Sequence, residues 1–409
     1  MPIKKKLLVA LPLVALTLAA CGKASATGGN SGNGAHSASQ SIPGVTATSI
    51  KIGFTGPISG SAGLAGQGIT AGMTIAADEI NAAGGVNGRK LDLDLLDDQY
   101  DPARTVANVR RLVSEDHVYA LVAPAGSQGL PGAWSFIKST DTPVWGPISP
   151  TDPQMQQVYN LSATRTAQDE VGVDYFAKQG KKRIALIMVN NDTGQGGLDA
   201  VQAQVPKHPG MSLVAQATVE TGSTDVSSAV LKVLASKPDA LVVATSNSQL
   251  ALILKQLRSQ GSTIPVVSDQ GAAGTGGTNA TGLAGAAANG LIGGLQVALP
   301  NDSSPAVKTW LALAKKSTMP QAVSSFSLQG YGYLMSFVDV IKRAGKDLSY
   351  DNFYKVADSL KSDPVNVGVM PPVACGPLPT GHTCSDGAAL AIYTNGAWKP
   401  LLGFTSPQK

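Results

Sequence analysis

The spacing of hydrophobic residues predicts a strand, a helix and a second strand within the segment 50–95. Apolar side chains alternate with polar or small ones over 50–54 and again over 91–95, as they do in strands. Between them, apolar residues recur every three or four positions over 69–80, which forms one face of a helix. Two parallel strands joined by a helix need a right-handed crossover. Because ligands of such sheets bind beyond the carboxyl ends of the strands, loop 56–68 is the first candidate for ligand contact.

Strand and helix patterns continue to alternate through the rest of the chain. Short apolar runs, most of them followed by a helical pattern, predict buried strands over 118–123, 143–146, 183–189, 212–219, 240–244, 264–267 and 291–297. The last of these should return the chain to the first lobe. The Gly/Ala/Thr-rich stretch 274–289 fits either a loop or a loose helix. Ser304-Pro305 predicts a helix start, and Asn395-Gly396 predicts a tight hairpin.

This order of elements predicts the fold class. Strands that alternate with helices are typical of parallel sheets covered by helices on both faces. We therefore expect an α/β protein with two doubly wound parallel-sheet lobes joined by a three-strand hinge. The first lobe should comprise residues 49–167 with 293–365, and the second 168–292 with 366–409.

The N-terminal residues have the pattern of a secretion signal followed by a tether. Lys4–Lys6 precede an uncharged apolar run over 7–20 that is too short to span a bilayer comfortably. The run ends in Leu-Ala-Ala-Cys, which looks like a bacterial lipobox, so residues 1–21 are predicted to be a lipoprotein signal with Cys21 as the lipidation site. An ordinary signal peptide with a chance cysteine is the alternative. Residues 22–48, rich in Gly, Ser, Ala and Asn, predict a flexible tether.

Composition places the remainder among globular proteins. Hydrophobic residues make up 43% of the chain, which is too high for disorder, and the formal net charge is only +4. The one dense basic cluster belongs to the signal, so nucleic acid is not an expected partner. No further segment resembles a membrane span, so the folded part should be soluble and attached to the membrane by lipid.

The two remaining cysteines lie close together near the C-terminus. Cys375 and Cys384 enclose a short loop that contains His382. An exported protein lies in an oxidising space, which favours a disulfide between them. A metal site is the alternative, although two thiolates and one imidazole lack the fourth ligand of a structural zinc site. No other cluster predicts a metal, and no cofactor is expected.

Two motifs resemble catalytic or nucleotide-binding patterns without meeting their requirements. Gly66-Gln67-Gly68 resembles a dinucleotide fingerprint, but about ten residues separate it from the preceding strand. Close helix packing explains these glycines better. Ser127 lies at a strand-to-helix turn, as a hydrolase nucleophile does, but Ala125 occupies a position where that motif needs glycine. We therefore expect no enzyme, and we interpret Ser127 as a donor to an anion or carbonyl oxygen.

Acidic residues near the second strand form no pair that spacing singles out. Their alternation predicts an ordinary solvated face that comprises Asp92, Asp94, Asp97 and Asp98.

Four motifs occur in the order and spacing of a known family. They are Ile50–Gly53, Gly56–Gly60, Asp78–Gly88 and Asp97–Pro102. With these motifs the chain resembles the Leu/Ile/Val-binding family of substrate-binding proteins, the extracytoplasmic receptors of ABC importers. The resemblance extends from about Ser49 to the end of the sequence and is weaker after Pro300.

The resemblance implies a type I periplasmic-binding-protein fold that holds a solute between its lobes. It places Ser127, with Gln128 beside it, against the carboxylate of the ligand. Ile148 and Ser149 fall in the segment that offers a backbone carbonyl and a hydroxyl to the ligand ammonium. Pro150 stands where a threonine is usual, so Ser149 has to supply that hydroxyl.

Other positions depart from the family pattern. Thr193 and Asn247, like Ala65, fall where aromatic residues are common, and Gln270 falls where an acidic residue pairs with the ligand ammonium. A buried ammonium without a carboxylate partner loses several kcal/mol of hydration. We therefore predict that leucine, isoleucine and valine are not the preferred ligands, and that an amide-like or carboxylate solute is.

Together these observations predict a solute-binding lipoprotein of an ABC importer. It should lie outside the cytoplasm, be anchored through Cys21, and contact a small solute and the permease subunits. A sensing lipoprotein of the same fold and, less favoured, a secreted hydrolase that uses Ser127 are the alternatives. The identity of the solute does not follow from the sequence.

Overall fold

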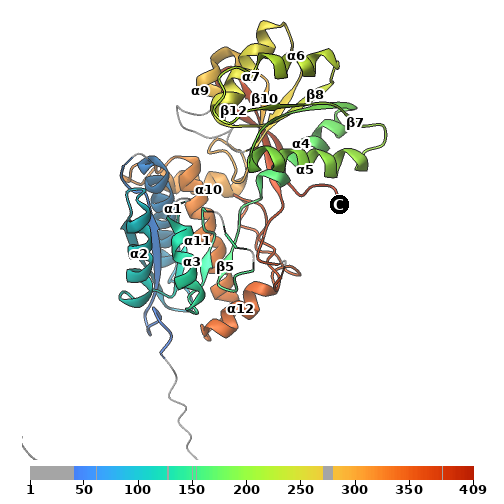
Figure 1. Ribbon diagram of the computed structural model, residues 1–409. Helices are drawn as coiled ribbons and strands as arrows, with labels where there is room; N and C mark the ends of the chain where they lie inside the picture. The colour runs from blue at the N-terminus through green and yellow to red at the C-terminus, as the bar shows by residue number, and fades with distance from the viewer. Residues whose placement is uncertain are drawn as a thin grey trace, which may run out of the picture. The chain divides into compact units, whose positions relative to one another are not determined.

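The computed structural model describes residues 41–60, 62–126, 129–149, 151–152, 154–269, 280–379 and 381–409. The predicted signal, Cys21 and the tether up to residue 40 lie outside the described residues. So do three of the predicted ligand-binding residues, namely Ser127, Gln128 and Gln270, and Pro150, which follows Ser149. Ser41–Lys409 form one compact unit that contains two sheets, each with its own helices (Figure 1).

The first sheet has five strands, all parallel, in the order β2-β1-β3-β4-β5. The predicted strand-helix-strand unit is confirmed as β1, α1 and β2, and Ile50, Ile52 and Phe54 are fully buried. The elements around this sheet are β1 (Ser49–Gly56), α1 (Gly63–Ala82), β2 (Lys90–Asp97), α2 (Pro102–Ser114), β3 (Ala120–Val122), α3 (Leu130–Lys138), β4 (Val144–Trp145), β5 (Val158–Tyr159), α10 (Pro305–Ala314), α11 (Ser325–Ala344) and α12 (Tyr350–Asp358).

The second sheet has seven strands in the order β12-β11-β10-β9-β8-β6-β7. Strands β6 to β10 are parallel to one another, whereas β11 is antiparallel to both β10 and β12 and forms the predicted Asn-Gly hairpin with β12. The elements are α4 (Arg165–Lys178), β6 (Arg183–Val189), α5 (Asp192–Gln204), η1 (Val205–Lys207), β7 (Ser212–Val219), α6 (Ser227–Ala235), β8 (Ala240–Ala244), α7 (Asn247–Ser259), β9 (Val266–Ser268), α9 (Ala280–Ala284), η2 (Gly285–Ala288), β10 (Leu291–Leu295), β11 (Ala388–Thr394) and β12 (Ala397–Thr405).

The Gly66-Gln67-Gly68 motif belongs to helix packing. A methyl group at Gly66 would overlap the carbonyl oxygen of Pro57, and one at Gly68 would lie 2.5 Å from Cβ of Phe326 on α11. Gly72, one turn further along α1, has the same role, because a methyl group there would overlap the carbonyl oxygen of Ser327. The interpretation of these glycines as packing residues is therefore confirmed.

Two expected assignments of segments to lobes are wrong. The strand expected over 291–297 was to return to the first lobe, but β10 extends the second sheet between β9 and β11. Residues 366–409 were expected in the second lobe, yet Val369, Met370, Val373 and both cysteines pack into the core of the first. The physical reason is local: α11 presents Gly332, whose missing side chain leaves room for Val369 and Met370.

Three chain segments connect the lobes, and hydrogen bonds join the first of them to the second and to the residues just before the third. They are residues 160–164, 296–298 and 385–387, each between elements of different sheets. Asn160 N–H donates to the carbonyl of His382, and Cys384 N–H donates to the carbonyl of Asn160, both at 2.8 Å. Gln296 Nε2 donates to the carbonyl of Ala163 at 3.0 Å. The predicted three-strand hinge therefore consists of segments that contact one another.

Candidate functional site

A polar cavity of about 250 Å³ lies at the carboxyl ends of β6 and β8. Its walls come from the ends of these strands, from the loop after β7 and from the first residues of α4, α5 and α7. The lining residues are Arg165, Val189, Asn191, Thr193, Thr221, Gly222, Thr245, Ser246, Asn247 and Gln249. The structure thus brings together the two described second-lobe positions that the resemblance selects, Thr193 and Asn247.

Local hydrogen bonding places two helix N-termini at this cavity. Asn191 caps α5, because its Oδ1 accepts from the N–H groups of Thr193 at 3.0 Å and Gly194 at 3.4 Å. Ser246 caps α7 by accepting from Gln249 N–H at 3.4 Å. Gly194 is required because a methyl group there would overlap the carbonyl oxygen of Val189 at the end of β6. Both helices therefore direct their positive dipole ends to one place.

A guanidinium group lies at the edge of the same cavity. Arg165 Nη1 is 3.1 Å from Oδ2 of Asp269, which is nearly buried. Asp169, on α4, is completely enclosed, and its Oδ1 has no hydrogen-bond partner among the described residues. Burial, together with the charge of Asp269, raises the pKa of Asp169 well above its ordinary value, although Arg165 opposes the shift. The surroundings therefore favour the neutral form of Asp169, and Asp269 is the acid that pairs with Arg165.

The first-lobe positions lie at the carboxyl ends of β3 and β4. Ile148 N–H donates to the carbonyl of Pro124 at 2.8 Å, and its carbonyl accepts from Gly126 N–H at 3.3 Å. A parallel bridge between Ala125 and Ile148 continues the sheet at this point. Neither Ile148 nor Ser149 lines the cavity described above. Their contact with a ligand stays a prediction, as do the contacts of Ser127, Gln128 and Gln270.

The loop after β1 is held by an acid that the sequence placed on a solvated face. Asp97 Oδ1 accepts from the N–H groups of Ile58 at 2.9 Å and Ser59 at 3.1 Å, and Oδ2 accepts from the Ser59 hydroxyl. Asp98 is fully buried and accepts from Thr105 at 2.8 Å. The expectation of a solvated face is therefore wrong for Asp98, which is buried, whereas Asp97 is only half-buried. Asp97 fixes the loop that is the first candidate for ligand contact, whereas Asp98 holds Tyr100 and Thr105 after β2.

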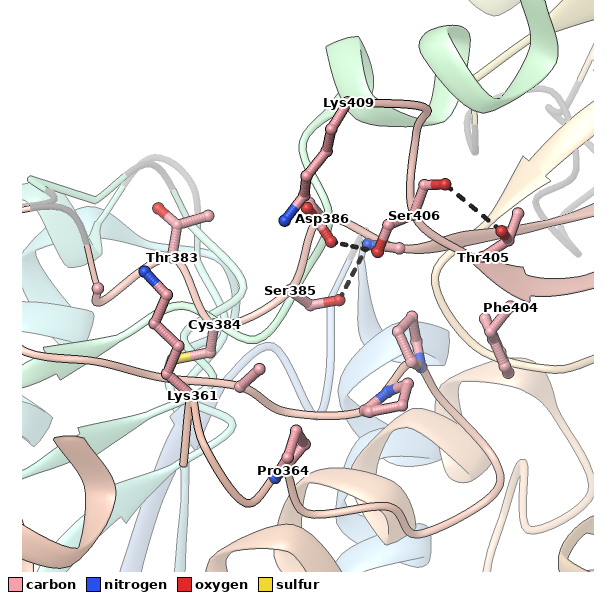
Figure 2. Close-up of a pocket in the computed structure, with 15 residues that line it drawn as sticks. Lys361, Pro364, Thr383, Cys384, Ser385, Asp386, Phe404, Thr405, Ser406 and Lys409 are labelled. Atoms are coloured by element: carbon pink, nitrogen blue, oxygen red, sulfur yellow. Dashed lines mark hydrogen bonds between the residues drawn. The ribbon is translucent and has the colours of Figure 1, made fainter. Parts of the chain in front are cut away.

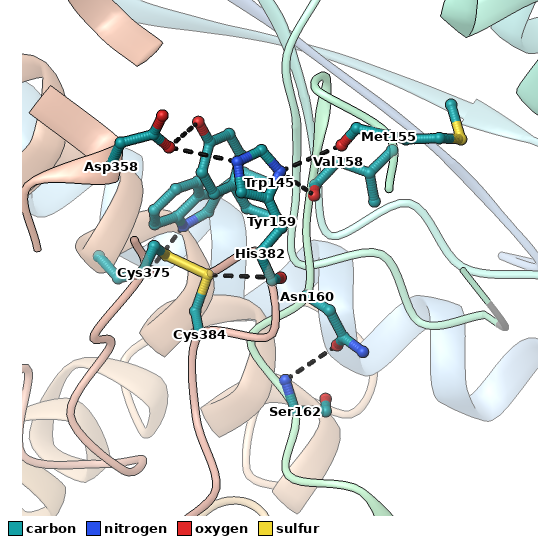
Figure 3. Close-up of a disulfide and its surroundings, with 11 residues drawn as sticks. Trp145, Met155, Val158, Tyr159, Asn160, Ser162, Asp358, Cys375, His382 and Cys384 are labelled. Carbon is teal, nitrogen blue, oxygen red and sulfur yellow. Dashed lines mark hydrogen bonds and ion pairs between the residues drawn. A yellow bond between two sulfur atoms is a disulfide. The ribbon is translucent and has the colours of Figure 1, made fainter. Parts of the chain in front are cut away.

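The disulfide between Cys375 and Cys384 is confirmed (Figure 3). His382, inside the loop that it closes, is buried against Tyr159, and the two ring centroids are 4.1 Å apart. Its Nδ1 lies 3.1 Å from the carbonyl oxygens of Met155 and Val158, and its Nε2 lies 3.2 Å from Asp358 Oδ1. Because both ring nitrogens contact protein oxygens, the histidine has a structural role, and the alternative of a metal ligand is not favoured.

A second cavity, of about 580 Å³, adjoins the third connecting segment (Figure 2). It is lined by residues around Pro364, Pro371, Ser385 and Phe404. Two lysines, Lys361 and Lys409, also lie on its wall. It is larger than the polar cavity, but it contains no position that the family resemblance selects. We place the candidate site at the smaller cavity because strand ends and helix N-termini converge there.

A model of the periplasmic binding protein family matches residues 49–393. The chain belongs to this family. As a member, it is a solute-binding protein and not an enzyme, and membership implies a location outside the cytoplasm. Among the described residues, no helix combines the length and the apolar character that crossing a membrane requires.

Individual proteins agree with this assignment. An amino acid binding protein of Pseudomonas aeruginosa is 30% identical over 228 residues, which span 54% of this chain and 60% of that relative. A Leu/Ile/Val-binding protein homolog of Brucella melitensis is 26% identical over 76% of this chain and 83% of its own length. The solved structure of a branched-chain amino acid transporter substrate binding protein from Streptococcus pneumoniae has a TM-score of 0.66 at 22% identity, and it covers 88% of this chain and 100% of that one. At this identity, the structure establishes the fold.

Proposed function

We propose that this protein is the solute-binding lipoprotein of an ABC importer and captures a small amino-acid-like, polar or organic-acid solute. The polar cavity at the carboxyl ends of β6 and β8 carries the proposal, because parallel sheets bind ligands at this edge. The names of two relatives, an amino acid binding protein and a Leu/Ile/Val-binding protein homolog, support a solute of amino-acid size.

Capture depends on contacts from both lobes. Thr193, Asn247 and Gln270 would hold the solute on the second lobe, and the segments with Ser127–Gln128 and Ile148–Ser149 would hold it on the first. A solute that contacts both lobes binds the closed arrangement better than the open one, and thereby shifts the protein toward closure. The three connecting segments would serve as the hinge.

A fluorescence-transfer experiment tests closure. Arg104 on α2 and Lys255 on α7 are exposed, and each belongs to a different lobe. The full chain, purified in mild detergent with dyes on R104C and K255C, is titrated with amino acids, amides and organic acids. We expect a change in transfer with each solute that raises the unfolding temperature. Thermal stabilisation without any change in transfer would contradict closure.

The lipid anchor rests on the lipobox-like sequence that ends at Cys21. Two or more acyl chains are sufficient for stable membrane attachment. We expect Cys21→Ala to lack the lipid mass and to leave the membrane fraction. Unchanged mass and unchanged membrane retention would show that Cys21 is not the anchor.

A role in import implies contact with permease subunits. We expect deletion of the gene to abolish uptake of the solute that stabilises the purified protein. Normal uptake combined with a lost transcriptional response to that solute would instead favour sensing.

A further inference from the structure

The polar cavity has an unusual chemical lining for a site that would hold an aliphatic amino acid. Among the described residues that form its wall, Arg165 is the one charged residue, and no aspartate or glutamate is present. Val189 is the one residue with a branched hydrocarbon side chain. Hydroxyl and amide groups make up most of the remainder. This wall offers hydrogen-bond donors and positive charge and little apolar surface.

The guanidinium of Arg165 is anchored on one side and available on the other. Of the described residues, only Asp269 accepts a hydrogen bond from it, through Nη1 at 3.1 Å. The side chain of Asp269 is 4% exposed, whereas that of Arg165 is 59% exposed. A guanidinium carries five N–H donors in a planar fork, which fits carboxylate and phosphate oxygens bidentately. The buried acid therefore orients the fork and leaves most of its donors for another partner.

The surroundings favour an anion over an ammonium at this position. The N-termini of α5 and α7 both contribute partial positive charge. An ammonium here would lie beside Arg165, and the buried carboxylate of Asp269 is already paired with that arginine. An oxyanion instead gains charge-assisted hydrogen bonds from the guanidinium and further ones from the hydroxyls of the wall.

We propose that this cavity is an oxyanion subsite, so that the solute is an organic acid that presents a carboxylate or phosphate group to Arg165. The inference rests on the proposed function, because it assigns the class of solute that binds in the same polar cavity. The acid group occupies the second lobe, and the remainder of the solute extends toward the first.

Calorimetric titration of the full chain in mild detergent tests the substrate class. The probes are succinate, its diamide succinamide, glycerol 3-phosphate and leucine. Succinate and succinamide share a carbon skeleton and differ in charge, and glycerol 3-phosphate separates phosphate from carboxylate recognition. We expect one of the two acids to bind at least tenfold more tightly than succinamide and leucine. Failure of both acids to bind the wild type overturns the proposal.

Three variants then assign the binding to this cavity. Arg165→Gln should weaken binding of the acid at least tenfold. Because this change also leaves Asp269 without its cation, Asn247→Asp is the sharper variant. It keeps the Arg165–Asp269 pair, places a carboxylate in the cavity, and puts it at the first residue of α7, where an acid suits the helix. It should repel the acid and leave the unfolding temperature unchanged or higher. Lys232→Gln, which removes an exposed positive charge from α6, is the control and should bind normally.

The outcomes separate this inference from the proposed function. Tighter binding of any probe by Asn247→Asp would mean that the cavity receives a cation, which overturns the inference. Closure with leucine but not with either acid would also overturn the inference, but it would leave the proposed solute-binding function intact. Acid binding that depends on Arg165 without any closure would keep the oxyanion subsite and remove the hinge mechanism.

Discussion

At the scale of single residues, Asp97 and Asp98 are neighbours whose pKa values shift in opposite directions. Burial alone would raise the pKa of Asp97, but hydrogen bonds from the Ser59 hydroxyl and from the N–H groups of Gln99, Ser59 and Ile58 lower it overall. Burial dominates at Asp98 and raises its pKa, although it accepts from Tyr100 and Thr105. The folded environment therefore favours the anion of Asp97 and the neutral form of Asp98.

We expect Asp97→Asn to destabilise the protein at pH 7 by about 1–2 kcal/mol, because hydrogen bonds to a charged acceptor weaken. An acid with a lowered pKa in the folded state contributes stability above its unfolded pKa, and this is lost as the pH falls through the folded value. The deficit of the variant should therefore shrink below about pH 4. Urea unfolding at pH 7 and at acidic pH measures it. A deficit that does not change with pH would contradict the assigned charge state.

Asp98→Asn provides the matched comparison. When folding raises the pKa of an acid, the protein loses stability as the pH rises through that value. The charge of such an acid therefore opposes folding at pH 7. Asparagine can still accept from Tyr100 N–H, and its amide can donate to Thr105. We expect this variant to be as stable as the wild type at pH 7, or more stable. A loss as large as that of Asp97→Asn would be inconsistent with these shifts.

The sequence could not reveal these roles, because alternation along a strand predicts exposure only while the strand lasts. β2 ends at Asp97, where the chain turns and Gln99 and Tyr100 adopt positive φ. The carboxylate of Asp97 then accepts from backbone N–H groups of the loop after β1, and that of Asp98 accepts from Tyr100 N–H and the Thr105 hydroxyl. Such contacts between distant segments leave no local periodic signal.

At the scale of elements, α1 and α11 pack closely through residues without side chains. Gly68 and Gly72 on α1 face α11, and Gly330 on α11 faces the backbone of Ile69. Sequence periodicity predicted α1, and its glycines suggested close helix packing. Periodicity could not identify the partner helix, which follows more than 240 residues later, because no local pattern encodes that distance.

We expect Gly72→Ala to lower the free energy of unfolding by about 2–3 kcal/mol, because its methyl group would overlap backbone that cannot rotate away. Gly132→Ala on α3 is the control. A methyl group there meets only a methyl of Val106 at 3.1 Å, and alanine favours the helix over glycine. That variant should remain within about 1 kcal/mol of the wild type. Equal losses in the two variants would contradict the packing argument.

The disulfide is the second stabilising element whose effect can be measured. It closes a loop with a sequence separation of nine residues, for which the chain-entropy model predicts about 2–3 kcal/mol. We expect the double variant Cys375→Ala, Cys384→Ala to lose this amount in urea unfolding. Reductant should destabilise the wild type similarly and leave the double variant unchanged. A double variant that still responds to reductant would show that another thiol is responsible.

At the scale of the whole molecule, the order of elements could be predicted but the division between lobes only in part. The sequence pattern located the strands of both sheets except the two-residue strand β5, and their alternation with helices predicted parallel sheets. The errors fall on residues 291–297 and 366–384, next to the connecting segments. An apolar strand fits either sheet equally well, so pairing rather than local pattern decides its place.

The residues of the candidate site could likewise be predicted from the sequence only in part. Thr193 and Asn247 could be selected from the resemblance, and the structure places both in one cavity. Arg165 was missed because it precedes its lobe's first strand and makes its ion pair with Asp269, over a hundred residues later. The signal available in the sequence was a single arginine after a Thr that caps α4.

The two lobes have separate hydrophobic cores, and this predicts how the molecule unfolds. The core around β1 and α11 shares no residue with the two clusters that surround β6 and β8. Between them lies a small cluster with Leu295, Leu299, Ala389 and Ala391, next to the connecting segments. Proteins with independent cores depart from two-state unfolding, because each core can lose its packing alone. We therefore expect two calorimetric transitions in the absence of solute.

Substitutions assign each transition to a lobe. Gly72→Ala should lower one transition by several degrees, because its contact lies in the first core. Val243→Ala removes two methyl groups from a fully buried strand of the second core, at a cost of about 2 kcal/mol, and should lower the other. A solute that binds both lobes must dissociate before either unfolds, so it should draw the two transitions together. A single transition that both variants shift equally would show instead that the connecting segments couple the cores into one cooperative unit.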